Sequence, residues 1–199
     1  GGLPATAFDH LEDAVAALKS EGFRVSVDSL DARELLRGGG AGADYLLSLT
    51  IDKLWVADEV AAVPVLIPRE PSDEASLHAA IDAMRQKGKP FLADAILDPI
   101  PFGLLASLCR YQRLRERYAD IDIMMGVGNV TELTEADTSG INAVLFGIAA
   151  ELRAGAVLTT QVSGHARRAV KEADVARRVM YAAREHQSLP KGYTDELMT

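Results

Sequence analysis

Short apolar segments alternate with longer amphipathic segments along this 199-residue chain. A short, mostly apolar run is typical of a strand in a parallel sheet, because helices cover one face of the strand and its other face is also buried. The pattern therefore predicts six β-strands, at Phe23–Asp28, Asp44–Leu49, Pro64–Ile67, Phe91–Leu97, Ile121–Met125 and Ala156–Thr160.

The segments between the predicted strands have the periodicity of amphipathic helices. One helix face is formed by apolar residues at spacings of three and four, namely Leu77, Ala80, Ile81 and Met84. Gly88 follows them and can end that helix. The same spacing predicts helices over residues 8–18, 104–114, 141–152 and 170–183, with shorter ones over 31–37 and 51–60. Strand followed by helix, six times over, predicts an α/β fold with right-handed crossovers.

Two architectures fit this order of elements, an open doubly wound sheet and a closed barrel. The Gly-rich fingerprint of dinucleotide-binding sheets is absent after the first predicted strand. The run Gly38–Gly42 instead follows a short helix, and we interpret it as a helix stop and turn. A closed (β/α)8 barrel has eight strands and ~250 residues. Since six strands are predicted here, we expect the first two strands of such a barrel to be missing from this chain.

Composition restricts the class of protein. Hydrophobic residues make up 48% of the chain and charged residues 25%, as in an ordinary globular domain, and we predict one domain over residues 1–199. The net charge of −8 argues against nucleic acid as a partner. No apolar stretch reaches the ~18 residues of a membrane-spanning helix, and the first residues lack the pattern of a signal peptide. We therefore expect a cytoplasmic protein without a membrane partner.

The sequence offers little sign of metal binding or of a nucleophile. Its four histidines show no metal-ligand spacing, so we expect no metal site. No serine or cysteine nucleophile motif is found. The single cysteine, Cys109, excludes an internal disulfide and favours a reducing compartment. It lies in a predicted helix, and we interpret it as a core thiol.

Two carboxylates follow predicted strands at the end where α/β folds place their sites. Asp28 ends the first predicted strand, and Asp98 follows the fourth. A carboxylate accepts two parallel hydrogen bonds from a planar fork of N–H donors, such as the edge of an amidine- or guanidine-like ring. The pair therefore predicts a ligand with such an edge. The alternative is that each aspartate caps the turn or helix that follows it.

The loop after the fifth predicted strand contains Gly126, Gly128 and Asn129. Glycine lets the backbone approach a ligand closely, and an asparagine side chain offers both a donor and an acceptor. These residues therefore predict a polar contact with the same ligand. The alternative is a tight turn, which needs glycine and asparagine for their backbone angles.

The last loop contains Ser163, His165 and Arg167 just before a predicted helix. Basic side chains at the start of a helix bind anions, and eight-stranded barrels frequently build a phosphate site from their last two loops. These three residues therefore predict a phosphate site. The alternative is that the basic residues form a solvated face of the helix.

In order and spacing, three of these motifs resemble the pterin-binding family, which includes dihydropteroate synthases and the pterin domains of methyltetrahydrofolate-dependent methyltransferases. The motifs are Val25–Ser29, Gly42–Ser48 and Leu97–Gly103. The resemblance runs from the third to the eighth strand of a (β/α)8 TIM-type barrel. It implies that Asp28 and Asp98 bind a pterin, and that Asp98 pairs with the amino-pyrimidine edge. Ser48 stands near the place where the family usually has a pterin-binding Asn.

The run Gly126–Leu133 resembles a signature of the dihydropteroate synthase-related proteins, which occur in organisms that make tetrahydromethanopterin. The synthases have a Ser-Arg-Lys motif after the seventh strand, whereas this chain has Asn129 and no lysine there. Asn129 matches the methyltransferase branch, in which the equivalent Asn lies near the reactive ring nitrogen of the pterin. The synthases bind phosphate through Arg-x-His after the eighth strand, and Ser163, His165 and Arg167 are similar in chemistry but not in spacing.

The resemblance implies a transferase of folate or tetrahydromethanopterin biosynthesis, in which an arylamine displaces diphosphate from a hydroxymethyl-dihydropterin diphosphate. Mg²⁺ would accompany the diphosphate, although its protein ligand in the synthases lies in the first strand. Family members are often homodimers. Two alternatives stay open, methyl transfer from a pterin to a corrinoid partner and a non-catalytic pterin-binding module.

Overall fold

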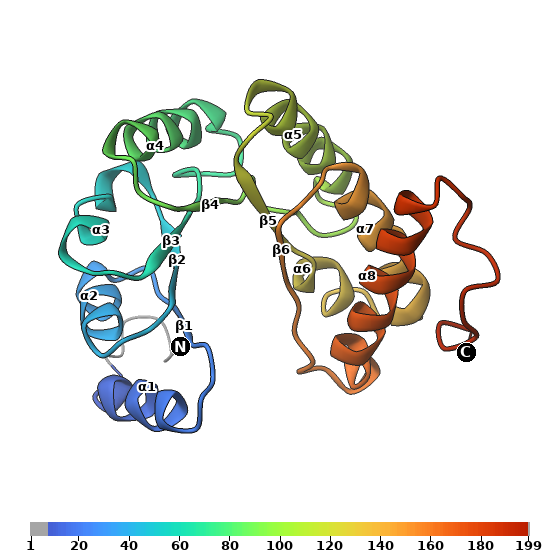
Figure 1. Cartoon of the computed structure of the whole chain (residues 1–199), viewed down its shortest axis with the longest axis horizontal. Helices are drawn as coiled ribbons and strands as arrows, with labels where there is room; N and C mark the ends of the chain where they lie inside the picture. The colour runs from blue at the N-terminus through green and yellow to red at the C-terminus, as the bar shows by residue number, and fades with distance from the viewer. Residues whose placement is uncertain (1–7, 199) are drawn as a thin grey trace. The chain divides into compact units, whose positions relative to one another are not determined.

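The computed structural model describes residues 8–198, which belong to two compact units, unit 1 (residues 1–94) and unit 2 (residues 95–199). Within each unit, helices and parallel strands alternate along the chain (Figure 1). All six predicted strands are present, so this part of the prediction is confirmed. No helix among the described residues has the length and apolar character needed to cross a membrane.

Unit 1 contains four strands and the helices between them. Its elements are α1 (Leu11–Ser20), β1 (Ser26–Asp28), α2 (Ala32–Gly40), β2 (Tyr45–Leu49), the 3-10 turn η1 (Ile51–Lys53), α3 (Val56–Glu59), β3 (Val63–Leu66), α4 (Glu74–Lys87) and β4 (Leu92–Ala93). The strands pair in parallel and in chain order, β1 with β2, β2 with β3, and β3 with β4. Helices α2, α3 and α4 lie along one side of these strands (Figure 1).

The core of unit 1 forms where this helical layer meets the strands. Leu46 on β2 and Leu66 on β3 are fully buried, and so are Leu35 on α2 and Ile81 on α4. Burying a side chain of this size contributes roughly 1.5–3 kcal/mol. Helix α4 ends as predicted, because Gly88 adopts the left-handed conformation that glycine accepts without strain.

Helix α2 ends within the run Gly38–Gly42, as the sequence predicted, but the helix extends further into the run than expected. Helix α2 continues through Gly38 and Gly39 and ends at Gly40. The reason is tertiary packing: a Cβ on Gly38 would lie 2.7 Å from Val27 Cγ2, and one on Gly39 would lie 2.9 Å from Val60. Glycine at these positions lets the helix approach its neighbours closely, which outweighs its weak helix propensity.

Unit 2 contains two strands and a larger share of helix. Its elements are α5 (Leu104–Arg117), β5 (Asp122–Gly126), α6 (Gly128–Thr131), α7 (Thr138–Glu151), β6 (Ala156–Leu158), the 3-10 turn η2 (Gly164–Ala166) and α8 (Ala169–Glu185). Strands β5 and β6 pair in parallel, and α7 packs against α8 (Figure 1). Because β5 and β6 run in parallel, their carboxyl ends bring α6, which carries Asn129, and the loop with Ser163 to the same edge.

Two details of the sequence prediction differ from the structure. The fourth strand spans only Leu92–Ala93, and Ile96 within the predicted strand has a positive φ of 62°. Such a backbone angle ends the extended conformation that a strand requires. Cys109 is exposed, so the prediction of a core thiol is wrong. Helix α5 instead buries the face that carries Tyr111 and Leu114.

Candidate functional site

Asp98 follows the fourth strand and is held by a buried arginine. Its Oδ2 lies 2.7 Å from Nη2 of Arg110 on α5, with 8% of the Arg110 side chain and 20% of the Asp98 side chain exposed. The backbone N–H of Asp98 donates to Oγ of Ser107, at 3.2 Å. Neither contact is a helix cap, because α5 begins after Gly103 without a side-chain cap. The alternative that Asp98 caps the following helix therefore has no support in its contacts.

Gly103 packs directly against the Asp98 carboxylate. A Cβ at this position would lie 3.0 Å from Asp98 Oδ2, and the backbone φ of Gly103 is 127°. An L-residue rarely adopts that angle, so both the conformation and the contact require glycine. The tight turn before α5 thus fixes the position of the carboxylate.

Asn129, on the short helix α6 after β5, contacts the residue that precedes Asp98. Its Nδ2 donates to the carbonyl oxygen of Leu97, at 2.7 Å. The structure therefore brings Asn129 next to the residue that precedes Asp98, the other predicted pterin-binding residue of unit 2. The bond also orients the amide, because Nδ2 is used and Oδ1 is left as an acceptor.

Glu132 was not singled out by the sequence, yet its carboxylate binds the predicted phosphate loop. Oε1 accepts the backbone N–H of Val162 at 2.7 Å, and Oε2 accepts that of Ser163 at 2.8 Å. These bonds, first that from Val162 and then that from Ser163, lower the pKa of Glu132 from 4.5 to about 2. The hydroxyl groups of Ser163 and Thr160 act in the same direction. The Glu132 carboxylate thus occupies two backbone N–H groups that could otherwise bind an anionic ligand.

The other predicted phosphate residues also have contacts within unit 2. Nε2 of His165 lies 3.0 Å from the carbonyl oxygen of Thr131, and Nε of Arg167 donates to the carbonyl oxygen of Gly164 at 3.0 Å. Helix α8 begins only at Ala169, so these residues precede it. A cavity of about 620 Å³ lies at this loop, lined by Glu135, Ala136, Ser163, Gly164 and His165.

The two predicted site residues of unit 1 contact each other. Ser48 lies within β2 and donates its hydroxyl to Oδ1 of Asp28 at the end of β1, at 3.0 Å. Ser48 also has a positive φ of 79°, an uncommon angle for a residue with a side chain. Asp28 does not cap α2, because the N-cap of that helix is Asp31. The exposed Asp28 carboxylate is therefore held by a hydroxyl and not by a helix.

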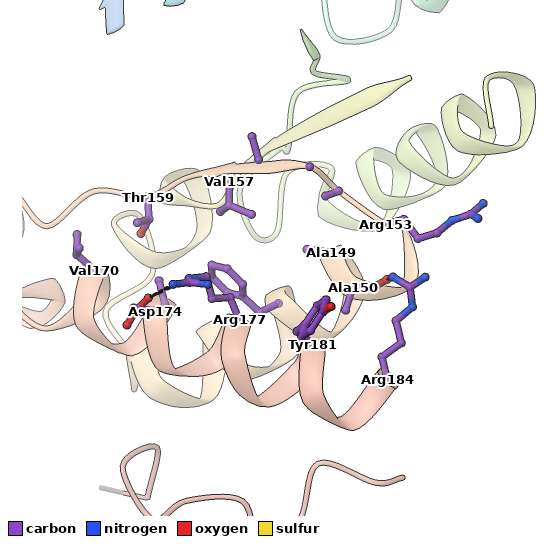
Figure 2. A pocket seen from close by; sticks show the side chains of 15 residues that line it. Ala149, Ala150, Arg153, Val157, Thr159, Val170, Asp174, Arg177, Tyr181 and Arg184 are labelled. Atoms are coloured by element: carbon purple, nitrogen blue, oxygen red, sulfur yellow. Dashed lines mark hydrogen bonds and ion pairs between the residues drawn. The ribbon is translucent and has the colours of Figure 1, made fainter. Parts of the chain in front are cut away.

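Strand β6 and helices α7 and α8 line a second, open pocket of about 510 Å³ (Figure 2). Tyr181 and Arg184 on α8 lie near Ala150 on α7 (Figure 2). Arg153 follows α7, and Arg177 pairs with Asp174. None of the side chains predicted to bind pterin or phosphate lines this cavity.

Arg110 and Glu132 are the two site residues that sequence reasoning missed. For Arg110 a signal was available, because it lies beside Tyr111 on the apolar face of the predicted helix, where a charged residue needs a buried partner. Glu132 gave no comparable signal, since its partners lie 30 and 31 residues away. Within residues 8–198, no group of three or more His, Cys, Asp or Glu side chains could hold a metal ion.

No family model matches this chain. Over 190 residues it is 34% identical to an uncharacterized protein of Methanocaldococcus jannaschii, an alignment that covers 84% of this chain and 35% of that protein. The chain thus spans little more than a third of this relative.

The similar solved structures include several dihydropteroate synthases. The enzyme of Yersinia pestis with a pterine-sulfa conjugate has a TM-score of 0.65 and 18% identity, over 94% of this chain and 81% of the enzyme. The Thermus thermophilus enzyme in complex with 4-aminobenzoate has a TM-score of 0.59 and 17% identity, over 85% of this chain and 80% of the enzyme. A putative spore coat polysaccharide biosynthesis protein E of Chromobacterium violaceum has a TM-score of 0.61 and 16% identity, over 86% of this chain and 54% of that protein. The chain has the α/β fold of the dihydropteroate synthases.

Proposed function

We propose that this chain is the pterin-binding part of a dihydropteroate synthase-like transferase, which joins a hydroxymethyl-dihydropterin diphosphate to an arylamine. The observation that carries the proposal is the fixed carboxylate of Asp98 beyond the fourth strand. Its Oδ2 is held by Arg110, and no other side chain among residues 8–198 binds its Oδ1. The fold shared with the dihydropteroate synthases supports the same assignment.

The proposed pterin contact follows from the geometry of a carboxylate. Two oxygens carry about four lone-pair directions, so Oδ2 can accept Arg110 and a ligand at once while Oδ1 accepts a second ligand N–H. The amino-pyrimidine edge of a pterin presents two such N–H groups side by side. Oδ1 of Asn129 offers a further acceptor next to it. In unit 1, Asp28 and Ser48 stay the proposed pterin-binding residues.

The proposed diphosphate site has few hydrogen-bond donors left for a ligand, because Glu132 already accepts the N–H groups of Val162 and Ser163. Arg167 keeps its two terminal nitrogens for an anion, since only its Nε has a partner among the described residues. The cavity at Ser163 and His165 is the proposed place for the phosphate groups. Mg²⁺ would enter with the diphosphate as part of the substrate. The arylamine nitrogen would form a bond to the methylene carbon of the pterin as the bond from that carbon to the diphosphate oxygen breaks, and the amine would lose a proton. In this scheme catalysis depends on positioning and on stabilising the departing anion.

Titration calorimetry with 6-hydroxymethylpterin tests the pterin site. We expect Asp98→Asn to weaken binding about tenfold or more, because an amide offers an N–H where the ligand also presents N–H. Asp195→Asn, which changes an exposed aspartate outside the site, is the matched control and should bind as the unchanged protein does. Equal affinity of all three proteins would reject Asp98 as the pterin ligand.

A second function is favoured by Glu132. Because its carboxylate already holds the N–H groups of Val162 and Ser163, the chain also fits a pterin site without a diphosphate site. Such a site suits methyl transfer or a non-catalytic binding module. Comparing the pterin alcohol with its diphosphate separates the two functions. A transferase binds the diphosphate much more tightly, whereas a module of the second kind binds both ligands equally.

A further inference from the structure

Arg110 is buried on α5 and binds three groups of one short segment. Its Nε donates to the carbonyl oxygen of Ala95 at 3.2 Å, and its Nη2 donates to the carbonyl oxygen of Ile96 at 2.8 Å. The same Nη2 donates to Oδ2 of Asp98 at 2.7 Å. One guanidinium group therefore connects the backbone of the segment to the carboxylate at its end.

The segment that Arg110 binds has an unfavourable backbone conformation. Strand β4 ends at Ala93, and three residues later Ile96 has a φ of 62°. A positive φ is rare for any residue with a Cβ and is an outlier for a β-branched one. Such a conformation persists only when its surroundings impose it. The hydrogen bond from Arg110 to the carbonyl oxygen of Ile96 is a contact that does so.

We propose that Arg110 is a positioning residue that holds the turn Ala95–Asp98 in its strained form and thereby aims the Asp98 carboxylate at the pterin. The pterin as ligand rests on the proposed function. The statement that Arg110 holds the turn does not, and it concerns only residues of unit 2. Arginine suits this role because its rigid, planar fork of donors reaches two carbonyl groups and a carboxylate together. The ammonium group of a lysine is a single point and cannot span them.

The first experiment compares Arg110→Met and Arg110→Lys with the unchanged protein. We expect both variants to bind 6-hydroxymethylpterin about 10- to 100-fold more weakly, because neither methionine nor lysine can bind the two carbonyl groups and the Asp98 carboxylate together. The control is Arg117→Met on the same helix, which removes an equal charge from an exposed position. Hydrogen exchange of the amides of residues 95–98 should speed up in both Arg110 variants and stay unchanged in the control.

The second experiment removes the strain instead of the arginine. Glycine adopts a φ near +60° without steric cost, so Ile96→Gly in the Arg110→Met background should restore slow exchange in part and recover pterin affinity in part. A role of Arg110 limited to filling space would give no such recovery. Arg110→Lys, which keeps the charge, serves where Arg110→Met unfolds.

The outcomes are distinguishable from those of the proposed function. Affinity losses in both Arg110 variants no larger than in Arg117→Met would overturn the proposal, as would exchange rates of residues 95–98 that do not change. If the unchanged protein bound no pterin, the proposed function would fail. The exchange rates would then still show whether Arg110 holds the turn.

Discussion

The carboxylate of Glu132 accepts the backbone N–H of Ser163, at 2.8 Å, and that of the preceding residue, at 2.7 Å. Two neighbouring N–H groups that point at one anion are the arrangement by which protein backbones bind phosphate. Here the anion belongs to the chain itself. The short helix α6 is thereby joined to the loop after β6, and both lie at the edge where the predicted ligand residues of unit 2 gather.

The first prediction concerns the pH dependence of stability. The folded state lowers the pKa of Glu132 from 4.5 to about 2, so its contribution is complete above pH 4.5 and is lost as the pH falls toward 2. Urea unfolding at a series of pH values should therefore show a smaller loss of unfolding free energy below pH 4.5 in Glu132→Gln than in the unchanged protein. Glu135→Gln, on the exposed neighbouring loop, is the control and should keep the steeper loss. Parallel curves for Glu132→Gln and the unchanged protein would contradict the prediction.

The second prediction concerns Gly103. We expect Gly103→Ala to lower the free energy of unfolding by about 1–3 kcal/mol. The alanine would have to adopt a φ of 127°, and its Cβ would lie 3.0 Å from the Asp98 carboxylate. The control Gly22→Ala also places alanine at a positive φ, 82°, but nothing lies within 4 Å of its Cβ. Only Gly103→Ala should also weaken pterin binding. Chemical denaturation and calorimetry measure the two effects, and equal results for both variants would argue against the contact with Asp98.

The third prediction concerns the glycines inside α2. Gly38→Ala should destabilise the protein by about 1–3 kcal/mol, since its Cβ would lie 2.7 Å from Val27 Cγ2. Gly40→Ala, whose Cβ meets nothing within 4 Å, should be neutral or stabilising by up to about 1 kcal/mol, because alanine favours a helix. Val27→Ala should relieve part of the cost of Gly38→Ala when the two are combined. Additive effects of these two substitutions in urea unfolding would mean that the residues do not clash.

The fourth prediction separates the anion from the pterin. Arg167→Ala should weaken binding of the hydroxymethylpterin diphosphate about tenfold and leave binding of the pterin alcohol unchanged, because only the diphosphate gains charge-assisted hydrogen bonds from the guanidinium. Calorimetry with the two ligands on the same variant provides its own control. Unchanged affinity for the diphosphate would remove Arg167 from the phosphate site.

Much of the fold follows from local patterns. Six apolar runs predicted six strands, and the spacing of Leu77, Ala80, Ile81 and Met84 predicted the buried face of α4. These features depend on neighbours three or four residues away, so one stretch of sequence contains the necessary information. The likeness to the pterin-binding family was visible at the same level, because its motifs are short and follow a fixed order.

The arrangement of the candidate site depends on contacts between distant residues. Arg110 meets Asp98 across 12 positions, Glu132 meets Ser163 across 31, and Asn129 meets Leu97 across 32. No local periodicity encodes such pairs. Likewise, a β-branched residue such as Ile96 disfavours a positive φ, so the surrounding structure must impose this angle. The sequence by itself determined which segments become strands and helices, whereas only the tertiary structure decided which charged groups meet, because that depends on where the packed core places their backbones.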